Sequence, residues 1–198
     1  MEAFHTLDAV MLPLVQANVD TDQILPARYL QKPRSAKFDE FLFRDLRYRK
    51  DGSENPDFAL NQSAYRAARI VVAGDNFACG SSREHAVWAL YDYGFRVAIA
   101  PSFGDIFFNN ALKNGLLPIV LPPGAVAALL AAARAIPGAQ VAVDLAAQTV
   151  TAPAGAVYPF SIDKFSKYCL LAGLDEIDYT LSQAEHITAF EQIFDHPE

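Results

Sequence analysis

Apolar runs and helical patterns alternate through the middle of the chain, separated by short polar loops. Three runs are typical of buried strands: residues 69–73, 97–100 and 116–121. Each is followed by a stretch that predicts a helix and ends near glycine or proline: residues 83–93, 102–112 and 125–135. This β-α-β-α-β-α order predicts an α/β fold, with a parallel sheet covered by helices.

The flanks of this unit have a different pattern. Residues 10–15 form a short apolar run that predicts a strand, and residues 141–145 and 149–151 alternate like a hairpin. Helices are expected over residues 162–172 and 182–194. No linker divides the chain, so we expect a single α/β domain with β-rich flanks over all 198 residues.

Residues 31–57 differ from their surroundings because they are rich in both charged and aromatic side chains. Such a long segment of low regularity is usually functional or mobile. We expect it to be an exposed excursion with one helical turn around residues 38–43.

The composition is that of a globular protein. Hydrophobic residues make up 52% of the chain and charged residues 20%, which argues against disorder. The net charge is −7 and no basic cluster is present, so we expect neither a nucleic-acid partner nor a membrane partner. The first residues include Glu2 and Asp8 and lack a basic start, so no signal peptide is expected. Prolines interrupt the uncharged stretch 114–133, so no membrane span is expected either.

Cysteine and histidine usage bears on compartment and metal binding. Cys79 and Cys169 lie far apart and form no CxxC pair, which favours a reducing compartment, here the cytoplasm. An iron–sulfur cluster takes more cysteine ligands than these two. The four histidines are scattered without metal-binding spacing. We therefore expect no metal site held by this chain.

The segment Gly74-Asp-Asn-Phe-Ala-Cys-Gly-Ser-Ser-Arg-Glu-His-Ala86 follows a predicted strand and opens a predicted helix. Backbone N–H groups and the helix dipole favour an anion at such a point. Arg83 opposes the dipole but is well suited to grip a carboxylate. Ser81 and Ser82 are candidate hydroxyls whose alkoxide would be stabilised there. The alternative for Ser81 and Glu84 is a purely structural S-x-x-E capping box.

Other polar residues have simpler interpretations. Cys79 is expected to be a small buried residue and His85 a packing residue. Ser102 begins what resembles an N-terminal helix cap. Asp20 and Asp22 flank a threonine, which is commonly a turn or a cap. These aspartates would be catalytic only if the fold brought them to the anion site.

Four stretches together resemble a known family: residues 18–30 (NVDTDQILPARYL), 74–95 (GDNFACGSSREHAVWALYDYGF), 100–119 (APSFGDIFFNNALKNGLLPI) and 160–178 (FSIDKFSKYCLLAGLDEID). They resemble the small subunits of bacterial 3-isopropylmalate dehydratase, which are related to the last, swivelling domain of aconitase. The similarity covers nearly the whole chain in the same order. Ala78 and Val87 depart from the family, which usually has glycine and often proline at these positions.

The resemblance implies that two subunits contribute different groups to one reaction. A large subunit would carry a [4Fe–4S] cluster whose open iron acts as a Lewis acid on the leaving hydroxyl. By similarity, Ser81 is the base, Arg83 holds a substrate carboxylate, Ser82 supports it, and Asp22 lies near the serine. The complex would be a heterodimer or heterotetramer that interconverts 2-isopropylmalate and 3-isopropylmalate through 2-isopropylmaleate in leucine biosynthesis.

The resemblance also implies a substrate-reading loop that includes Arg28, Tyr29 and Leu30. An apolar Leu30 suits an isopropyl group better than a third carboxylate. Two alternatives remain open. One is a small subunit for a related acid such as citramalate, methylmalate, homoaconitate or dimethylmaleate. The other is a non-catalytic anion-binding scaffold module.

Overall fold

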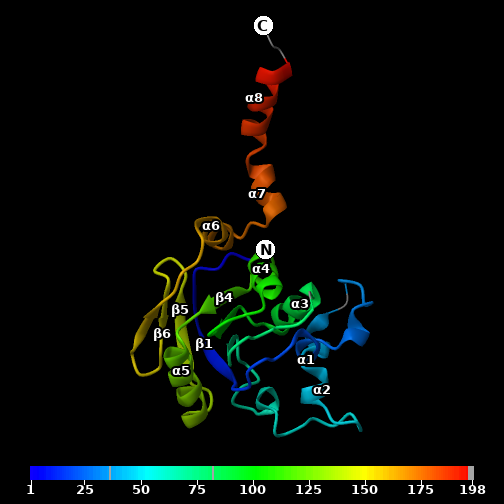
Figure 1. Cartoon of the computed structure of the whole chain (residues 1–198), viewed down its shortest axis with the longest axis vertical. Coiled ribbons are helices and arrows are strands. Elements are labelled where there is room, and N and C mark those ends of the chain that lie inside the picture. The colour runs from blue at the N-terminus through cyan, green and yellow to red at the C-terminus, as the bar shows by residue number, and fades with distance from the viewer. Residues whose placement is uncertain (36, 82, 196–198) are drawn as a thin grey trace.

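The computed structural model describes residues 1–35, 37–81 and 83–195. Its centre is a seven-stranded sheet with the order β4-β3-β2-β1-β5-β6-β7 (Figure 1). The strands are β1 (Thr6–Leu14), β2 (Ile70–Ala73), β3 (Val97–Ala100), β4 (Leu117–Val120), β5 (Gln140–Asp144), β6 (Thr149–Thr151) and β7 (Val157–Pro159).

Helices and 3-10 turns connect and cover these strands. The helices are α1 (Thr21–Ile24), α2 (Arg44–Arg47), α3 (Glu84–Tyr93), α4 (Asp105–Lys113), α5 (Pro123–Ala135), α6 (Lys164–Ala172), α7 (Glu176–Ser182) and α8 (Ala184–Asp195). The 3-10 turns are η1 (Ala27–Tyr29), η2 (Phe38–Phe41) and η3 (Ala59–Asn61). Within the part of the chain that the structure describes, no helix is both long and apolar enough to cross a bilayer.

Strand β1 joins two kinds of sheet. On one edge it pairs in parallel with β2, and β3 and β4 continue the parallel half. On its other edge it pairs antiparallel with β5, which begins the β5-β6-β7 meander. The predicted β-α-β-α-β-α unit and hairpin are confirmed. The meeting of both halves on β1 was not visible in the sequence, because strand order depends on contacts between distant segments.

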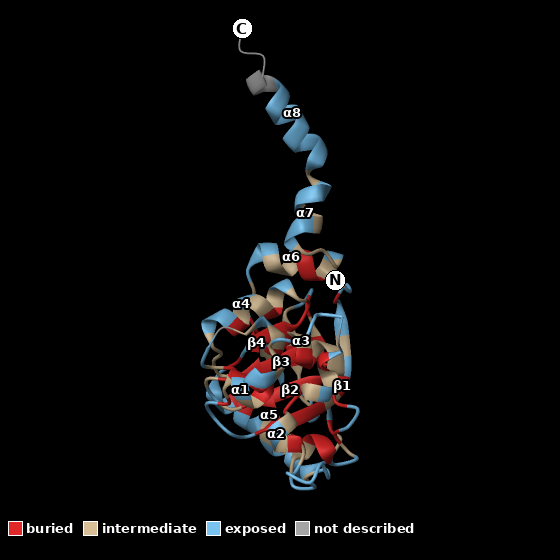
Figure 2. Ribbon diagram, turned by 90° about the vertical axis from the view of Figure 1, so that its right-hand side faces the viewer, coloured by how far each residue is buried: buried red, intermediate tan, exposed pale blue. Residues whose placement is uncertain are grey.

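The core lies on both faces of the sheet (Figure 2). On one face, Leu12 and Val71 pack with residues of α3 and α4. On the other, neighbouring positions such as Met11 and Val72 pack with residues of α5. All four residues of β2 are buried, as expected for a strand covered on both faces.

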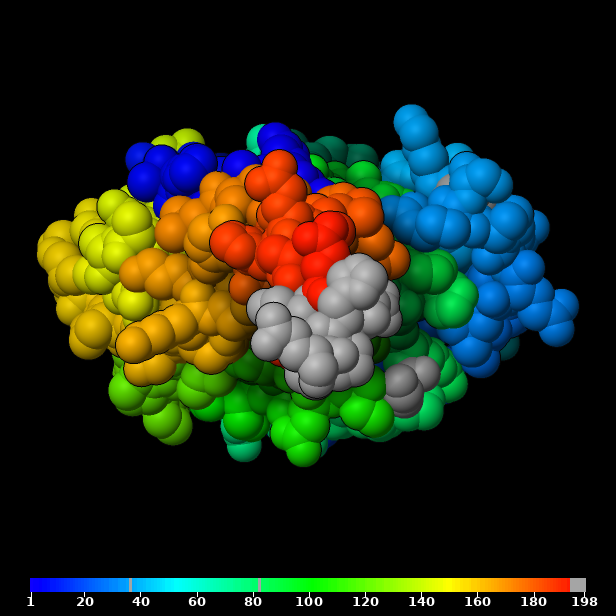
Figure 3. Space-filling view, turned by 90° about the horizontal axis from the view of Figure 1, so that it is seen from above, coloured from blue at the N-terminus to red at the C-terminus, as the bar shows by residue number. Residues whose placement is uncertain are grey.

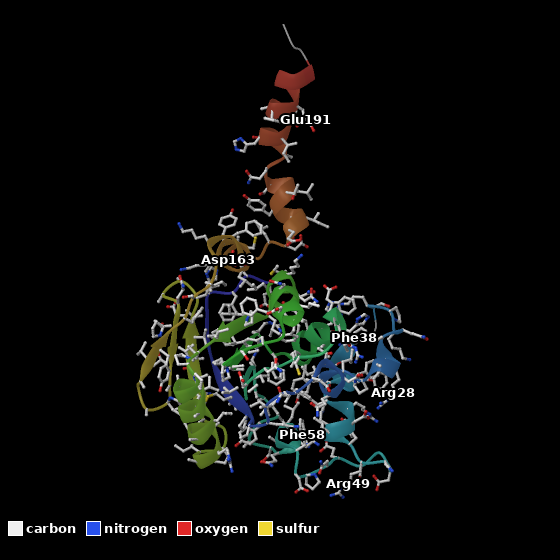
Figure 4. All side chains as sticks on the ribbon, in the orientation of Figure 1. Arg28, Phe38, Arg49, Phe58, Asp163 and Glu191 are labelled. Atoms are coloured by element: carbon white, nitrogen blue, oxygen red, sulfur yellow. The ribbon has the colours of Figure 1, made fainter. Side chains whose placement is uncertain are left out.

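The prediction that residues 31–57 form an exposed excursion is wrong for its aromatic core. Phe38, Leu42 and Phe43 are completely buried, and Phe38 packs edge-on against Trp88 of α3 with ring centroids 5.6 Å apart. The charged residues between them stay largely at the surface, which is why the segment resembled an exposed loop. The predicted helical turn is present as η2. In Figure 4, Phe38 lies beside α3 while Arg49 lies at the outer edge of the segment.

The C-terminal part also differs from its prediction. The helices expected over residues 162–172 and 182–194 are present as α6 and α8, and a further helix, α7, lies between them and is separated from α8 by a break. The break falls at Gln183, whose N–H bonds to the Thr180 carbonyl at the end of α7. Together α7 and α8 project away from the body of the domain (Figures 1 and 2).

Candidate functional site

The candidate site lies where the loops after β1 and β2 leave the sheet. Because these strands are parallel neighbours, their carboxyl ends lie side by side. The Asn18 N–H donates to the Asp75 carbonyl at 2.8 Å, and the Thr21 N–H donates to the Cys79 carbonyl at 3.0 Å. Asp20 and Cys79 form a short parallel bridge. Backbone hydrogen bonds therefore hold the two predicted polar segments together.

The two aspartates around Thr21 have different roles in the structure. Asp20 is the N-cap of α1 and forms a capping box with Gln23: its carboxylate accepts from the Gln23 N–H at 2.8 Å, and the Gln23 side chain accepts from the Asp20 N–H at 3.0 Å. Asp20 is thus a structural residue. Asp22 lies beyond the cap and is 54% exposed.

Asp22 forms an ion pair with Arg83. The Ala27 N–H also donates to Asp22 Oδ1 at 2.9 Å. The Arg83 guanidinium, helped by this N–H, holds the pKa of the Asp22 carboxyl below its usual value. The Arg83 side chain is only 14% exposed, and its Nη1 is the atom that contacts Asp22 Oδ1. Arg83 is therefore a nearly buried cation, and a guanidinium carries five N–H donors, more than the contact with Asp22 through Nη1 uses.

Ser81 is exposed and stands at the edge of this cluster. The Thr21 Oγ1 donates to the Ser81 carbonyl at 3.0 Å. Gly80, with φ +96°, turns the chain just before it. Ser82 lies outside the described residues.

The predicted capping box of Ser81 and Glu84 is wrong. The N-cap of α3 is Arg83, whose side chain forms no capping hydrogen bond, and α3 begins at Glu84. The Glu84 carboxylate instead accepts from Asn114 Nδ2 at 2.8 Å. The turn at Gly80 and the extended backbone of Arg83, with φ −140°, start the helix later than the motif suggests. The first N–H groups of α3 are left without a cap from Arg83, which suits an anion-binding position.

The loop that carries Ser81 is packed tightly against the start of α4. Ser102 Oγ donates to Asp75 at 2.6 Å and accepts from the Asn76 N–H at 2.9 Å. The prediction that Ser102 caps α4 is wrong, because the N-cap is Gly104. A Cβ on Gly104 would lie 2.5 Å from the Ala78 carbonyl oxygen.

The predicted substrate-reading residues lie close to Asp22: Arg28 and Tyr29 are on η1, and Leu30 is its C-cap. Arg28 forms a two-pronged ion pair with Asp45 of α2, with one contact of 2.8 Å, and holds the pKa of Asp45 below its usual value. The Tyr29 ring stacks on Phe41 at 4.2 Å between centroids. Leu30 packs against the core cluster and is partly exposed. Residues of the 31–57 segment therefore support this loop.

Sequence reasoning did not identify Asp45, Phe41 or Thr21 as parts of this site. No motif marks the first two, and only the packing of residues 31–57 against η1 brings them there. His85 packs against Phe38 and Trp88, as predicted. Cys79 is half-buried rather than buried. Among the described residues, no group of three His, Cys, Asp or Glu side chains is placed to hold a metal ion.

Comparison with known families agrees with the fold and the paired loops. The family model of the aconitase C-terminal domain matches residues 1–124, and the model LeuD_N matches residues 127–164. A crystal structure of 3-isopropylmalate dehydratase from Methanocaldococcus jannaschii superposes with a TM-score of 0.67 at 24% identity, covering 94% of this chain and 99% of that one. The chain therefore has the aconitase-type α/β fold of that domain class.

Two curated relatives show which family within this class the chain resembles. The chain is 54% identical over 191 residues to a 3-isopropylmalate dehydratase small subunit from Rhodospirillum centenum, covering 96% of this chain and 94% of the relative. It is 50% identical over 192 residues to a 3-isopropylmalate dehydratase small subunit from Cereibacter sphaeroides, covering 97% of this chain and 96% of the relative. The chain belongs to the family of 3-isopropylmalate dehydratase small subunits.

Proposed function

We propose that this chain is the small subunit of a hydro-lyase that interconverts 2-isopropylmalate and 3-isopropylmalate through 2-isopropylmaleate, in leucine biosynthesis in the cytoplasm. The observation that carries the proposal is the nearly buried Arg83 at the start of α3, paired with Asp22 in a chain that matches these small subunits over nearly its full length. An arginine in that position has few structural reasons to exist, because it opposes the helix dipole.

Arg83 binds a substrate carboxylate. Its planar guanidinium can keep Asp22 on one side and take a carboxylate on the other, and the N–H groups at the start of α3 add to the same field. Asp22 stays ionised because its pKa is lowered, so it orients the guanidinium over the working pH range. Asp22 thus acts through Arg83.

Ser81 is the base. In this role it removes a proton from the carbon beside the bound carboxylate and returns it on the other carbon. The bond from Thr21 to the Ser81 carbonyl holds the backbone that carries the hydroxyl, and Ser82 supports carboxylate binding. A serine works as a base only where its alkoxide is stabilised, and the cationic surroundings of Arg83 favour that charge.

The chain works with a large subunit, in a heterodimer or heterotetramer. The large subunit would carry the [4Fe–4S] cluster on its own cysteines and supply the Lewis acid for the leaving hydroxyl. Cys79 and Cys169 do not fit such a role, because a cluster takes more cysteine ligands than these two.

The loop of Arg28, Tyr29 and Leu30 reads the variable group of the substrate. Leu30 offers apolar surface next to the site, which suits an isopropyl group. The Arg28 charge is already paired with Asp45, so it does not offer a free cation for a third carboxylate. Both observations favour an alkyl malate over a tricarboxylic acid.

Reconstitution with the large subunit tests the proposal. We expect turnover of 2- and 3-isopropylmalate by the complex, slower turnover of citramalate and homoaconitate, and neither turnover nor cluster iron with this chain alone. Preference for another acid would reassign the substrate. A complex inactive on every malate analogue would support the non-catalytic scaffold and contradict the proposal.

A further inference from the structure

Helices α7 and α8 form a projection, which we call the C-terminal extension (residues 175–195). It leaves the body beyond α6, and in Figure 4 Glu191 lies far from the domain (Figures 1, 2 and 4). The base of the extension contacts the body. Glu176 pairs with Lys113 of α4 at 3.1 Å, and Tyr179 packs edge-on against Phe165 at 4.9 Å. Figure 3 shows the base beside the N-terminal residues.

Large apolar side chains of the extension are open to solvent. Ile177 and Leu181 of α7 are 71% and 66% exposed, and Ile187 and Phe190 of α8 are 41% and 60% exposed. Within each helix their spacing of four or three residues places the pair on one face. Grouped exposed apolar side chains mark an interaction surface, and an apolar helix face typically binds in a groove.

The length of α8 also points to a binding surface. The helix has 12 residues. Isolated helices shorter than about 12–15 residues are marginal in water, and most helices in proteins gain their stability from packing an apolar face. A helix of this length that projects from the domain therefore gains stability when another surface covers it.

The charge of the extension limits what that surface can be. Residues 175–198 contain seven carboxylates and no lysine or arginine, whereas residues 1–174 contain 16 acidic and 16 basic residues. The whole net charge of −7 therefore comes from this C-terminal part. Two such segments would repel each other, so pairing of the extension with that of a second copy is disfavoured. A partner surface with lysine and arginine beside an apolar groove is favoured instead.

We propose that the C-terminal extension is a docking element for the large subunit, which receives its apolar face in a groove bordered by basic residues. This inference rests on the proposed function, because it takes the large subunit as the partner. The alignment with small subunits spans 192 of the 198 residues, so these relatives carry most of the extension too.

The outer part of the extension, around Glu191, is placed so that it can anchor the partner without touching the reacting groups. Helix α4 runs from the Ser102 loop, which supports the candidate site, to Lys113 at the base of the extension. Its nine residues span about 14 Å. The base of the extension borders the start of α3, because Asn114, next to Lys113, donates to Glu84 at 2.8 Å, whereas the outer part around Glu191 lies far from the domain (Figure 4).

The test uses the full-length double variant Leu181→Ser/Phe190→Ser and a matched control, Gln192→Ala. Gln192 is exposed on α8 and, two residues from Phe190, does not share its face. Affinity for the purified large subunit is measured by calorimetry at low and high salt. We expect the double variant to bind at least about tenfold more weakly and the control to bind like wild type. Wild-type binding should weaken as salt rises.

Turnover separates this inference from the proposed function. At saturating large subunit, the double variant should recover wild-type kcat, because the candidate site is intact. Equal affinity of the double variant and wild type, in a complex that turns over isopropylmalate, would overturn only the docking inference. Wild-type self-association that is lost in the double variant would also overturn it, in favour of a second copy. A wild-type complex without turnover would overturn the proposed function instead.

Discussion

Thr21 Oγ1 donates a 3.0 Å hydrogen bond to the carbonyl oxygen of Ser81, 60 residues further along the chain. The bond joins the loop after β1 to the loop after β2. It joins the backbone of the exposed Ser81, two residues before Arg83, to the residue next to Asp22, which pairs with Arg83. The two loops that carry the candidate base and the candidate carboxylate site are therefore joined to each other.

Replacement of Ser81 separates catalysis from helix capping. Because α3 starts at Glu84 with Arg83 as its N-cap, Ser81→Ala should change the free energy of unfolding by less than about 0.5 kcal/mol. If Ser81 is the base, alanine, asparagine and aspartate should each lower kcat by roughly 10²–10⁴-fold. Urea unfolding and turnover of the reconstituted complex measure the two effects. Retention of more than about a tenth of wild-type turnover by Ser81→Asp would assign the proton transfer to another group.

The ion pair of Asp22 and Arg83 makes stability depend on pH. The pKa of Asp22 is lowered in the folded chain. Its contribution to the free energy of unfolding is therefore complete above the ordinary carboxyl pKa of 3.8. The contribution is lost as the pH falls through the lower, folded value. Asp22→Asn should therefore be less stable than wild type near neutral pH but lose less stability on acidification. Chemical unfolding from about pH 6 to about pH 3 measures both slopes, and parallel slopes would contradict the ion pair.

Arg83→Lys tests whether the guanidinium binds the carboxylate that all substrates share. A lysine keeps the charge but loses the two-pronged grip, so KM should rise for every malate analogue by a similar factor. Steady-state kinetics on a panel of analogues measures this. If turnover were lost on one substrate alone, Arg83 would instead be assigned to recognition of the variable group of the substrate.

Leu30→Arg tests the substrate-reading loop. An unpaired guanidinium against an isopropyl group is costly, whereas a third carboxylate could pair with it. We expect a lower kcat/KM for isopropylmalate and a relative gain for homoaconitate. Leu30→Met is the control, because it keeps an apolar side chain of similar volume. Identical substrate profiles for wild type and Leu30→Arg would remove Leu30 from the loop's function.

Two glycine-to-alanine replacements test the packing of the loop that carries Ser81. A Cβ on Gly104 would lie 2.5 Å from the Ala78 carbonyl oxygen, whereas a Cβ on Gly124 in α5 would meet nothing within 4 Å. Gly104→Ala should destabilise the chain by about 1–3 kcal/mol and lower turnover by displacing the loop. Gly124→Ala should be neutral or slightly stabilising. Thermal unfolding of both variants provides the comparison, and equal melting temperatures would contradict the close contact.

Local sequence patterns predicted the central strands and helices and the segment that carries the candidate chemistry. Strands β2, β3 and β4 and the helices after them follow from local apolar periodicity, which neighbouring residues set regardless of the rest of the chain. The unusual place of Arg83 at a helix start was likewise readable, because the cost of a cation there is a local property. The family resemblance rests on the same local stretches.

Contacts between groups far apart in the sequence became visible with the folded chain. Asp20 and Asp22 have equivalent positions around Thr21 in the sequence. In the structure, Asp20 is the N-cap of α1, whereas Asp22 forms an ion pair with Arg83. That difference depends on β1 and β2 being parallel neighbours. The predicted capping box does not form, because Gly80 turns the backbone before the helix begins. The burial of Phe38 was not predicted, because charged residues surround it in the sequence. Contacts of this kind follow from strand order and long-range packing, which local patterns do not encode.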